Sequence, residues 1–217
     1  MLRLAHRGDW RRATENTLPA LQAALEVQGC DGLEFDVRLA ADGVPVLLHD
    51  ETLARVKGRP ERVDEIGAGA LGALGVPSLA EVLAMIPRGA FLDVELKGRH
   101  GPAVVEVLAA GRGPDLANAV VSSFETDTLE RVAGLVPQWP RWLNACDLEP
   151  ATIVAATELE CRAIAVDWHA IDRAGLERAR AAGLAVATWT VRRRTTAARL
   201  DRLGVVAACV EAGALDG

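Results

Sequence analysis

Short apolar, β-rich runs alternate with Ala- and Leu-rich stretches along the whole of this 217-residue chain. The alternation is typical of βα units around a parallel sheet. Eight such units predict a closed (β/α)₈ barrel, with an open doubly wound sheet as the alternative. Barrels of this kind often occupy about 200–250 residues as one unit, so we expect residues 1–217 to form a single domain. The expected strands are Leu2–Arg7, Gly32–Leu39, Ala90–Lys97, Ala119–Phe124, Arg141–Cys146, Arg162–Asp167, Ala185–Val191 and Val205–Val210.

Helices are expected between these strands. In the first, Asn16 or Thr17 is expected to cap the helix, and Pro19 suits the first turn. Ser78 followed three residues later by Glu81 predicts a capping box at the start of the second. The expected helices are Thr17–Val27, Leu79–Ile86, Pro102–Ala110, Thr128–Leu135, Pro150–Glu158, Ala174–Ala182 and Thr195–Leu203.

One irregularity follows the second strand. Ala41-Asp42-Gly43 predicts a turn, and Val44–His49 is a second extended run, which together indicate a hairpin extension. Residues 50–76 are polar and rich in glycine, and they are too many for an ordinary βα loop. We therefore expect a small insertion here, or a lid over the strand ends.

Composition excludes several classes of protein. The chain has 24 Lys+Arg against 30 Asp+Glu, and no basic run stands beside aromatic residues, so no nucleic-acid partner is expected. No apolar stretch reaches the ~20 residues that cross a bilayer, and the N-terminus lacks the pattern of a signal peptide. We expect a cytoplasmic protein without a transmembrane segment. The four cysteines lack metal-site spacing and are expected to be buried thiols.

Carboxylates at the ends of neighbouring strands form a candidate metal site. Glu34 and Asp36 are two residues apart on a strand, so their side chains point to the same face. Glu95 ends the next barrel strand at the same level. Burying unpaired carboxylates in the barrel interior would cost roughly several kcal/mol of folding free energy, so a cation is expected among them. Three oxygen donors favour Ca²⁺ or Mg²⁺. The alternatives are solvated charges or an ion pair with an arginine.

Two cationic residues are candidates for binding an anion beside these carboxylates. Only Lys57 and Lys97 are lysines among the 24 basic residues, and Lys97 follows Glu95 on the same strand face. A compact ammonium there can reach a bound anion, although an ordinary surface lysine is the alternative. Arg7 can hold an oxyanion bidentately if the turn at Gly8 brings its side chain round.

Two of the four histidines, His6 and His49, each end an apolar run beside a charged residue. Imidazole titrates near neutral pH, so the pair can divide the work of a general acid and a general base. Purely structural histidines are the alternative. Trp189, near the end of the seventh strand, is expected to wall the pocket or to lie in the core.

Eight motifs occur in a specific order along the chain. They are His6-Arg7-Gly8, Glu15-Asn16-Thr17, Glu34-Phe35-Asp36-Val37, Asp42-Gly43-Val44-Pro45-Val46, His49-Asp50-Glu51-Thr52-Leu53, Glu95-Leu96-Lys97, Ser122-Ser123-Phe124 and Trp189-Thr190-Val191. Together they resemble the glycerophosphodiester phosphodiesterase family, and the resemblance covers nearly the whole chain. It implies a (β/α)₈ barrel that uses a bound divalent metal to hydrolyse glycerophosphodiesters, small-molecule substrates, to an alcohol and glycerol 3-phosphate.

The resemblance also implies roles for individual residues. Glu15 is expected beside the site, near the metal or the His6 side. The chain departs from the family pattern at Arg192, where asparagine is frequent, and at residues 204–211, the last strand. By motif, the metal ligands are Glu34, Asp36 and Glu95, the acid/base pair is His6 and His49, and the phosphate-binding groups are Arg7 and Lys97.

Two other functions fit the same barrel. A lysophospholipid or sphingomyelin headgroup can be the substrate, as in phospholipase D-like relatives, and comparing glycerophosphocholine with lysophosphatidylcholine separates that function from the first. A non-catalytic phosphate-binding barrel is the third, and it would bind ligand without metal-dependent hydrolysis.

Overall fold

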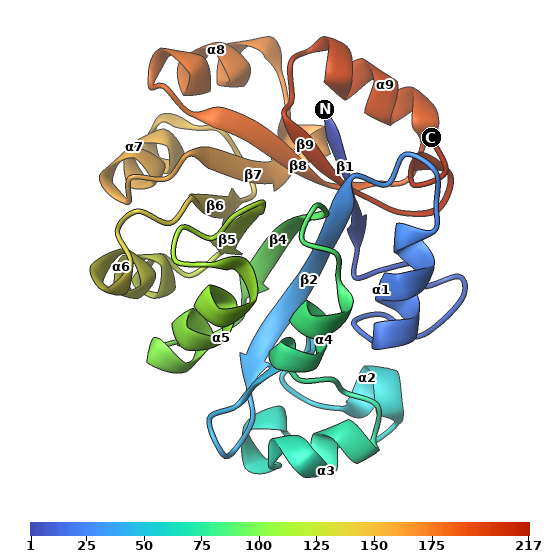
Figure 1. The fold of residues 1–217 in the computed structure, drawn as a ribbon. Helices are drawn as coiled ribbons and strands as arrows, with labels where there is room; N and C mark the ends of the chain where they lie inside the picture. Colours follow the sequence, from blue (N-terminus) through green and yellow to red (C-terminus); the bar gives the residue numbers. More distant parts are fainter.

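The computed structural model describes residues 1–217 and has eight parallel strands that close into a barrel (Figure 1). β1 pairs with β9 on one side and with β2 on the other, which closes the sheet. This closure confirms the predicted (β/α)₈ barrel and excludes the open doubly wound sheet. The barrel strands are β1 (Leu2–His6), β2 (Gly32–Leu39), β4 (Phe91–Leu96), β5 (Ala119–Ser123), β6 (Arg141–Ala145), β7 (Ala163–Asp167), β8 (Ala185–Val191) and β9 (Ala207–Val210).

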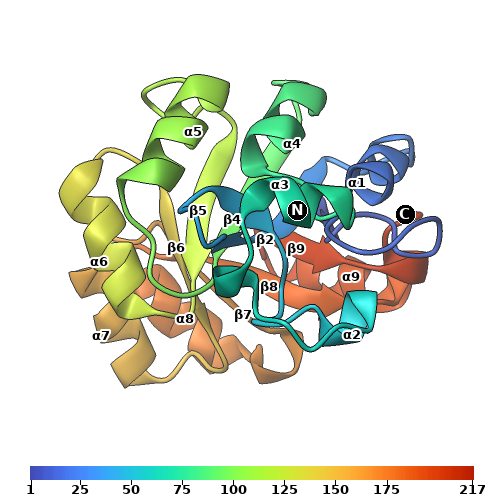
Figure 2. The same cartoon turned by 90° about the horizontal axis from the view of Figure 1, so that it is seen from below.

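Helices surround this barrel in both views (Figures 1 and 2). All seven predicted helices are present, and their bounds differ from the predicted ones by no more than two residues. The longest has 11 residues, so no helix could cross a bilayer. The helices between barrel strands are α1 (Leu18–Leu25), α4 (Leu79–Met85), α5 (Pro102–Arg112), α6 (Thr126–Leu135), α7 (Pro150–Glu158), α8 (Arg173–Ala181) and α9 (Arg194–Arg202), with short 3₁₀ turns η2 (Trp168–Ala170) and η3 (Ala212–Ala214).

The two predicted caps have different outcomes. The capping box of α4 is confirmed, because the Ser78 hydroxyl accepts from the Glu81 amide and the Glu81 carboxylate accepts from the Ser78 amide. At α1 the predicted position is confirmed, because Thr17 is the N-cap residue, but the side-chain hydrogen bond of a cap is missing. The Thr17 hydroxyl donates to the Thr14 carbonyl. Both polar atoms of the Asn16 side chain bond to Asp36 instead, since Nδ2 donates to its carboxylate and Oδ1 accepts from its amide.

The segment after β2 forms the predicted hairpin and insertion. β3 (Pro45–Leu47) pairs antiparallel with β2, and α2 (Ala54–Lys57), η1 (Val63–Glu65) and α3 (Ala68–Ala73) follow. These elements share a small apolar core of their own. Residues 50–76 line no part of the central cavity described below.

The barrel interior is apolar at one end and polar at the other. On β1, Leu4 and His6 point inward because strand side chains alternate, and Leu4 belongs to an inner cluster completed by Val120, Trp142 and four alanines. The larger apolar core lies outside the strands, beneath the helices. Polar side chains therefore concentrate at the carboxyl ends of the strands.

The cysteines are all free. Cys161 and Cys209 are buried as expected, but Cys146 is exposed and Cys30 is half-buried, so burial of all four was wrong. Cys146 follows the last residue of β6, where the chain leaves the sheet and the alternation that buries strand side chains ends.

Candidate active site

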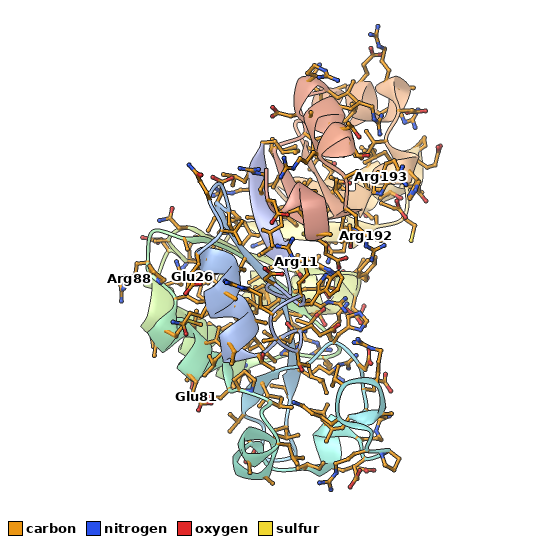
Figure 3. All side chains as sticks on the ribbon, turned by 90° about the vertical axis from the view of Figure 1, so that its right-hand side faces the viewer. Arg11, Glu26, Glu81, Arg88, Arg192 and Arg193 are labelled. Atoms are coloured by element: carbon orange, nitrogen blue, oxygen red, sulfur yellow. The ribbon has the colours of Figure 1, made fainter.

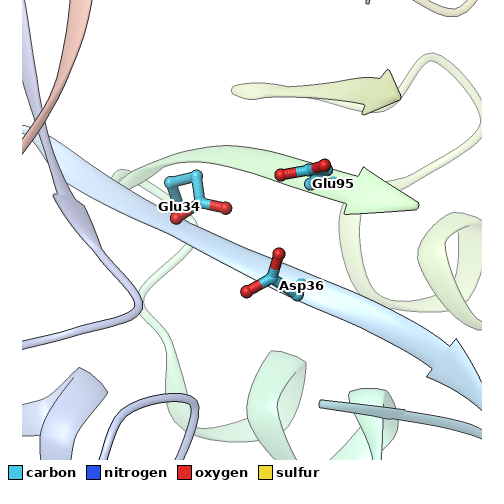
Figure 4. Close-up of side chains that lie close together, drawn as sticks. All are labelled: Glu34, Asp36 and Glu95. Carbon is cyan, nitrogen blue, oxygen red and sulfur yellow. The ribbon is translucent and has the colours of Figure 1, made fainter. Parts of the chain in front are cut away.

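Three carboxylates converge at the polar end of the barrel, on the neighbouring strands β2 and β4 (Figure 4). Asp36 stands directly opposite Glu95 in the β2–β4 register. One oxygen from each of Glu34, Asp36 and Glu95 lies within 4.8 Å of the others, and all three residues are buried. The predicted set thus comes together as the strand periodicity requires.

Their electrostatics are those of an anionic site that lacks full compensation. Burial raises the pKa of Glu34 well above its usual value, and the charge of Asp36 raises it further. Burial and Asp36 together raise the pKa of Glu95 to about 7. Both Glu34 carboxylate oxygens and Oδ1 of Asp36 are buried without a hydrogen bond. Hard oxygen donors left without partners fit a divalent cation such as Ca²⁺ or Mg²⁺.

Arg7 reaches the same group of carboxylates. Its Nε lies 2.9 Å from Oδ2 of Asp36, so the arginine ion pair weighed as an alternative is present at one of the three acids. The turn predicted at Gly8 brings the side chain round: Arg7 and Gly8 have φ of 59° and 86°. A Cβ on Gly8 would lie 2.5 Å from the backbone of Ala20, so only glycine fits this turn.

Lys97 lies between two of the carboxylates. Its Nζ is 3.4 Å from Oδ1 of Asp36 and also forms an ion pair with Glu95. Burial acts against the charge on Asp36, yet Arg7 and Lys97 outweigh it and hold the pKa of Asp36 below its usual value. The two cations therefore neutralise part of the acidic set while keeping Asp36 ionised.

His6 is held by a second carboxylate that the sequence did not single out. Its Nδ1 lies 2.6 Å from Oε1 of Glu211, just after β9, and Oε2 of Glu211 accepts from Nε of Arg192 at 2.7 Å. Burial opposes ionisation of Glu211, but His6 and Arg192 lower its pKa to about 2. The other ring nitrogen, Nε2, is 3.8 Å from Glu34.

His49 has a matching arrangement on the opposite side. Its Nδ1 lies 2.6 Å from Oδ1 of Asp50, and Asp50 accepts from Nε of Arg55 at 2.7 Å. Arg55 also forms two hydrogen bonds to Glu15, at 2.7 and 2.8 Å, and Glu15 accepts from Arg7 at 3.0 Å. Burial lowers the pKa of His49, which favours its neutral form. Glu15 thus supports Arg7 and lies away from the carboxylate set.

A cavity of about 210 Å³ opens above these groups. Seven of the nine predicted site residues line the cavity: six charged or ionisable ones and Trp189. The other two do not line it, because Asp36 lies beneath its surface and Glu15 to the side. Trp189 is half-buried and donates from its indole to the Ala165 carbonyl, so it walls the cavity while packing on the barrel. The cavity is lined by His6, Arg7, Glu34, His49, Asp93, Glu95, Lys97, Phe124, Asn144, Trp189, Thr190 and Cys209.

Five lining residues lay outside the predicted set: Asp93, Phe124, Asn144, Thr190 and Cys209. Asp93 is two residues before Glu95 and therefore on the same inward face. Burial raises its pKa to about 7, and the Ser122 hydroxyl donates to it at 2.6 Å. Phe124 follows β5, packs edge-on to Trp189, and has Lys97 5.5 Å from its ring centre. Asn144 lies on the next strand, with its amide oxygen unpartnered.

Comparison with known proteins identifies the family. Residues 6–212 match the model of the glycerophosphoryl diester phosphodiesterase family. This range includes every residue that lines the cavity. The chain belongs to this family. Membership confirms the predicted class of enzyme, a phosphoric diester hydrolase.

Relatives in the family match nearly the whole chain. A glycerophosphodiester phosphodiesterase of Caldanaerobacter subterraneus subsp. tengcongensis is 30% identical over 93% of this chain and 90% of its own length. An Oleispira antarctica phosphodiesterase, solved with its product sn-glycerol-3-phosphate, is 27% identical with a TM-score of 0.87 over 97% of this chain and 92% of that one. An Agrobacterium tumefaciens glycerophosphodiester phosphodiesterase is 26% identical, with a TM-score of 0.83 over 100% and 98%.

Proposed function

We propose that this chain hydrolyses glycerophosphodiesters to an alcohol and glycerol 3-phosphate, with a divalent metal and the His6–His49 pair. The observation that carries the proposal is the close grouping of three buried carboxylates, two cations and two carboxylate-bound imidazoles in one cavity and directly beneath its surface. The relative solved with sn-glycerol-3-phosphate shares this fold over nearly its whole length and supports the choice of product.

Glu34, Asp36 and Glu95 would hold the metal. Their donor set is all oxygen, and Glu34 has no hydrogen bond to satisfy either oxygen, which suits Ca²⁺ or Mg²⁺. A bound divalent ion supplies Lewis-acid stabilisation of the charge on the phosphoryl oxygens. Without the ion, only the ion pairs with Lys97 and Arg7 would compensate the negative charge of the buried carboxylates.

Arg7 and Lys97 would bind the phosphodiester. Both line the cavity, and both are fixed by ion pairs to Asp36, so their positions are set before substrate arrives. Pre-positioned positive charge is effective because it needs no reorganisation as negative charge grows on the phosphate oxygens. Glu15 orients Arg7 from outside the cavity.

The two histidines would move the protons. In each, a carboxylate holds Nδ1, and a carboxylate can only accept, so Nδ1 carries hydrogen. Nε2 is then the working atom of each ring in the cavity. One Nε2 takes the proton of the nucleophile, water or the glycerol 2-hydroxyl, and the other returns a proton to the departing alkoxide oxygen. The two arrangements are alike enough that either histidine fits either role.

The decisive experiment measures glycerol 3-phosphate release from several glycerophosphodiesters, with added Ca²⁺ or Mg²⁺ and with chelator. We expect metal-dependent release that chelator abolishes. Lysophosphatidylcholine is included because it distinguishes the phospholipase D-like activity, and binding of a glycerophosphodiester without any release would establish a non-catalytic barrel. We further propose that residues 1–217 act as one domain located in the cytoplasm.

A further inference from the structure

A second cavity, which we call the Trp168 cavity, shares a wall with the first. Trp189 and Thr190 line both. The remaining lining residues lie after β7 and β8 and in the first turns of α9: Asp167, Trp168, His169, Arg192, Arg193 and Thr196. The proposed function leaves this space without a role, although only Trp189 and Thr190 separate it from the phosphate-binding groups.

The Trp168 cavity carries positive charge in a chain whose net charge is −6. Arg192 and Arg193 are consecutive residues that both line it, and both are labelled in Figure 3. Arg193 is exposed, and its guanidinium makes no hydrogen bond or ion pair with the protein, although its carbonyl accepts from the Ala197 amide. Arg192 uses only its Nε, toward Glu211, so both terminal nitrogens remain free to donate. A third guanidinium, that of Arg199, lies 5.9 Å from the ring centre of Trp168.

The acidic groups nearby offset only part of this charge. Glu211 pairs with Arg192. Asp167 is the one acid in the lining, and its Oδ1 accepts from the backbone and the ring of His169, at 2.9 and 2.7 Å. The guanidinium groups of Arg193 and Arg199 have no acidic partner. The opposite rim differs. Beyond Phe124 comes Glu125, whose carboxylate faces Ser123 and the backbone of Gly98. A substrate group leaving the first cavity thus meets cations past Trp189 and an anion past Phe124.

We propose that the Trp168 cavity receives the alcohol headgroup of the diester and selects headgroups that carry an additional anion, a carboxylate or a phosphate. The guanidinium forks of Arg192 and Arg193 match such groups in geometry and charge. The indole faces of Trp168 and Trp189 supply the apolar walls for the carbon atoms between the two anions. This inference rests on the proposed function, because it assigns the substrate's second half to a place beside the same site.

The test compares two substrates that differ by one carboxylate, glycerophosphoserine and glycerophosphoethanolamine. The native enzyme is expected to have a higher kcat/KM for glycerophosphoserine than for glycerophosphoethanolamine. Arg193→Gln is expected to reduce the ratio of these two kcat/KM values by roughly two- to fivefold, the effect of one exposed ion pair. The ratio is also expected to fall as NaCl is raised. Glycerophosphoglycerol with and without a terminal phosphate forms the second arm, which separates phosphate from carboxylate recognition.

Arg99→Gln is the matched control. Arg99 is exposed, follows β4 at the same end of the barrel, and lines neither cavity. An equal change of the ratio in both variants would show a general charge effect and overturn the proposal, as would a native ratio of one in both arms. Calorimetric measurement of binding of the same substrates distinguishes failure of headgroup selection by the Trp168 cavity from failure of the proposed hydrolytic function. A binding preference that Arg193→Gln removes, without hydrolysis of any substrate, would support this cavity while refuting the proposed function.

Discussion

Nδ1 of His6 lies 2.6 Å from Oε1 of Glu211, and the other oxygen of that carboxylate is occupied by Arg192. The carboxylate fixes the tautomer of His6, because it can only accept the Nδ1 hydrogen. It also fixes the ring orientation that directs Nε2 toward Glu34. An imidazole oriented by an anion in this way is a better proton acceptor, since the imidazolium that forms is stabilised.

Glu211→Gln should therefore lower kcat by about 10- to 100-fold with little change of KM, because the amide can orient the ring wrongly and lacks the charge. Glu211→Asp should recover part of that loss. Glu26→Gln is the control, since exposed Glu26 pairs only with exposed Arg12. Equal kcat in Glu211→Gln and the native enzyme would contradict the positioning role.

Replacing either histidine by alanine should lower turnover by ~10²–10⁴-fold while the protein remains folded, because one proton transfer loses its donor or acceptor. Steady-state release of glycerol 3-phosphate measures this, and circular dichroism checks the fold. Near-native turnover in His6→Ala or His49→Ala would remove that residue from the mechanism.

The fold was predictable because its signals are local. Strand runs and the Ser78–Glu81 capping box depend on residues close together in the sequence. Two-residue spacing likewise placed Glu34, Asp36, Glu95 and Lys97 on inward faces. The same spacing would have found Asp93, had every inward residue of that strand been considered.

The rest of the site depends on contacts distant in sequence. Glu211 meets His6 across 205 residues, and Arg55 meets Glu15 across 40. Only barrel closure, which brings β9 beside β1, creates the first of these pairs. The expected cap by Asn16 failed for a similar reason: its Nδ2 donates to the Asp36 carboxylate, and its Oδ1, the atom that would accept from the helix amides, accepts from the Asp36 backbone N–H.

Metal-free protein should become more stable when Glu34 is replaced by glutamine. The folded-state pKa of Glu34 is raised, so ionisation works against folding as pH rises above about 4.5, the unfolded value. Glu34→Gln removes this pH dependence, and we expect a gain of roughly 1–3 kcal/mol near neutral pH without metal. Thermal unfolding in chelator measures it.

Added Ca²⁺ or Mg²⁺ should reverse that order. Metal that binds only the folded state raises the native Tm in proportion to its occupancy, and Glu34→Gln should lose most of that rise. Glu81→Gln, in the exposed capping box, serves as the matched control for a single Glu→Gln change. An undiminished metal-induced rise of Tm in Glu34→Gln would contradict its role as a ligand.

Arg55 connects the insertion to both sides of the site, so its removal should affect catalysis more than folding. Arg55→Gln frees Asp50, which holds His49, and Glu15, which holds Arg7. We expect kcat/KM to fall about tenfold, and the free energy of unfolding to change by less than about 1 kcal/mol because the pairs are partly exposed. Arg59→Gln, which breaks an exposed pair with Glu61 in the same segment, should leave kcat/KM unchanged.

Acid should weaken the fold through Glu211. Its folded-state pKa of about 2 lies below the usual value of 4.5, so its ionised form stabilises the fold above about pH 4.5, and this contribution is lost as pH falls toward 2. Denaturant unfolding of the native protein and Glu211→Gln, compared from pH 7 to pH 3, should show their difference shrinking by on the order of 2 kcal/mol. A difference that stays constant over this range would mean that the carboxylate is no better stabilised in the folded barrel than in the unfolded chain.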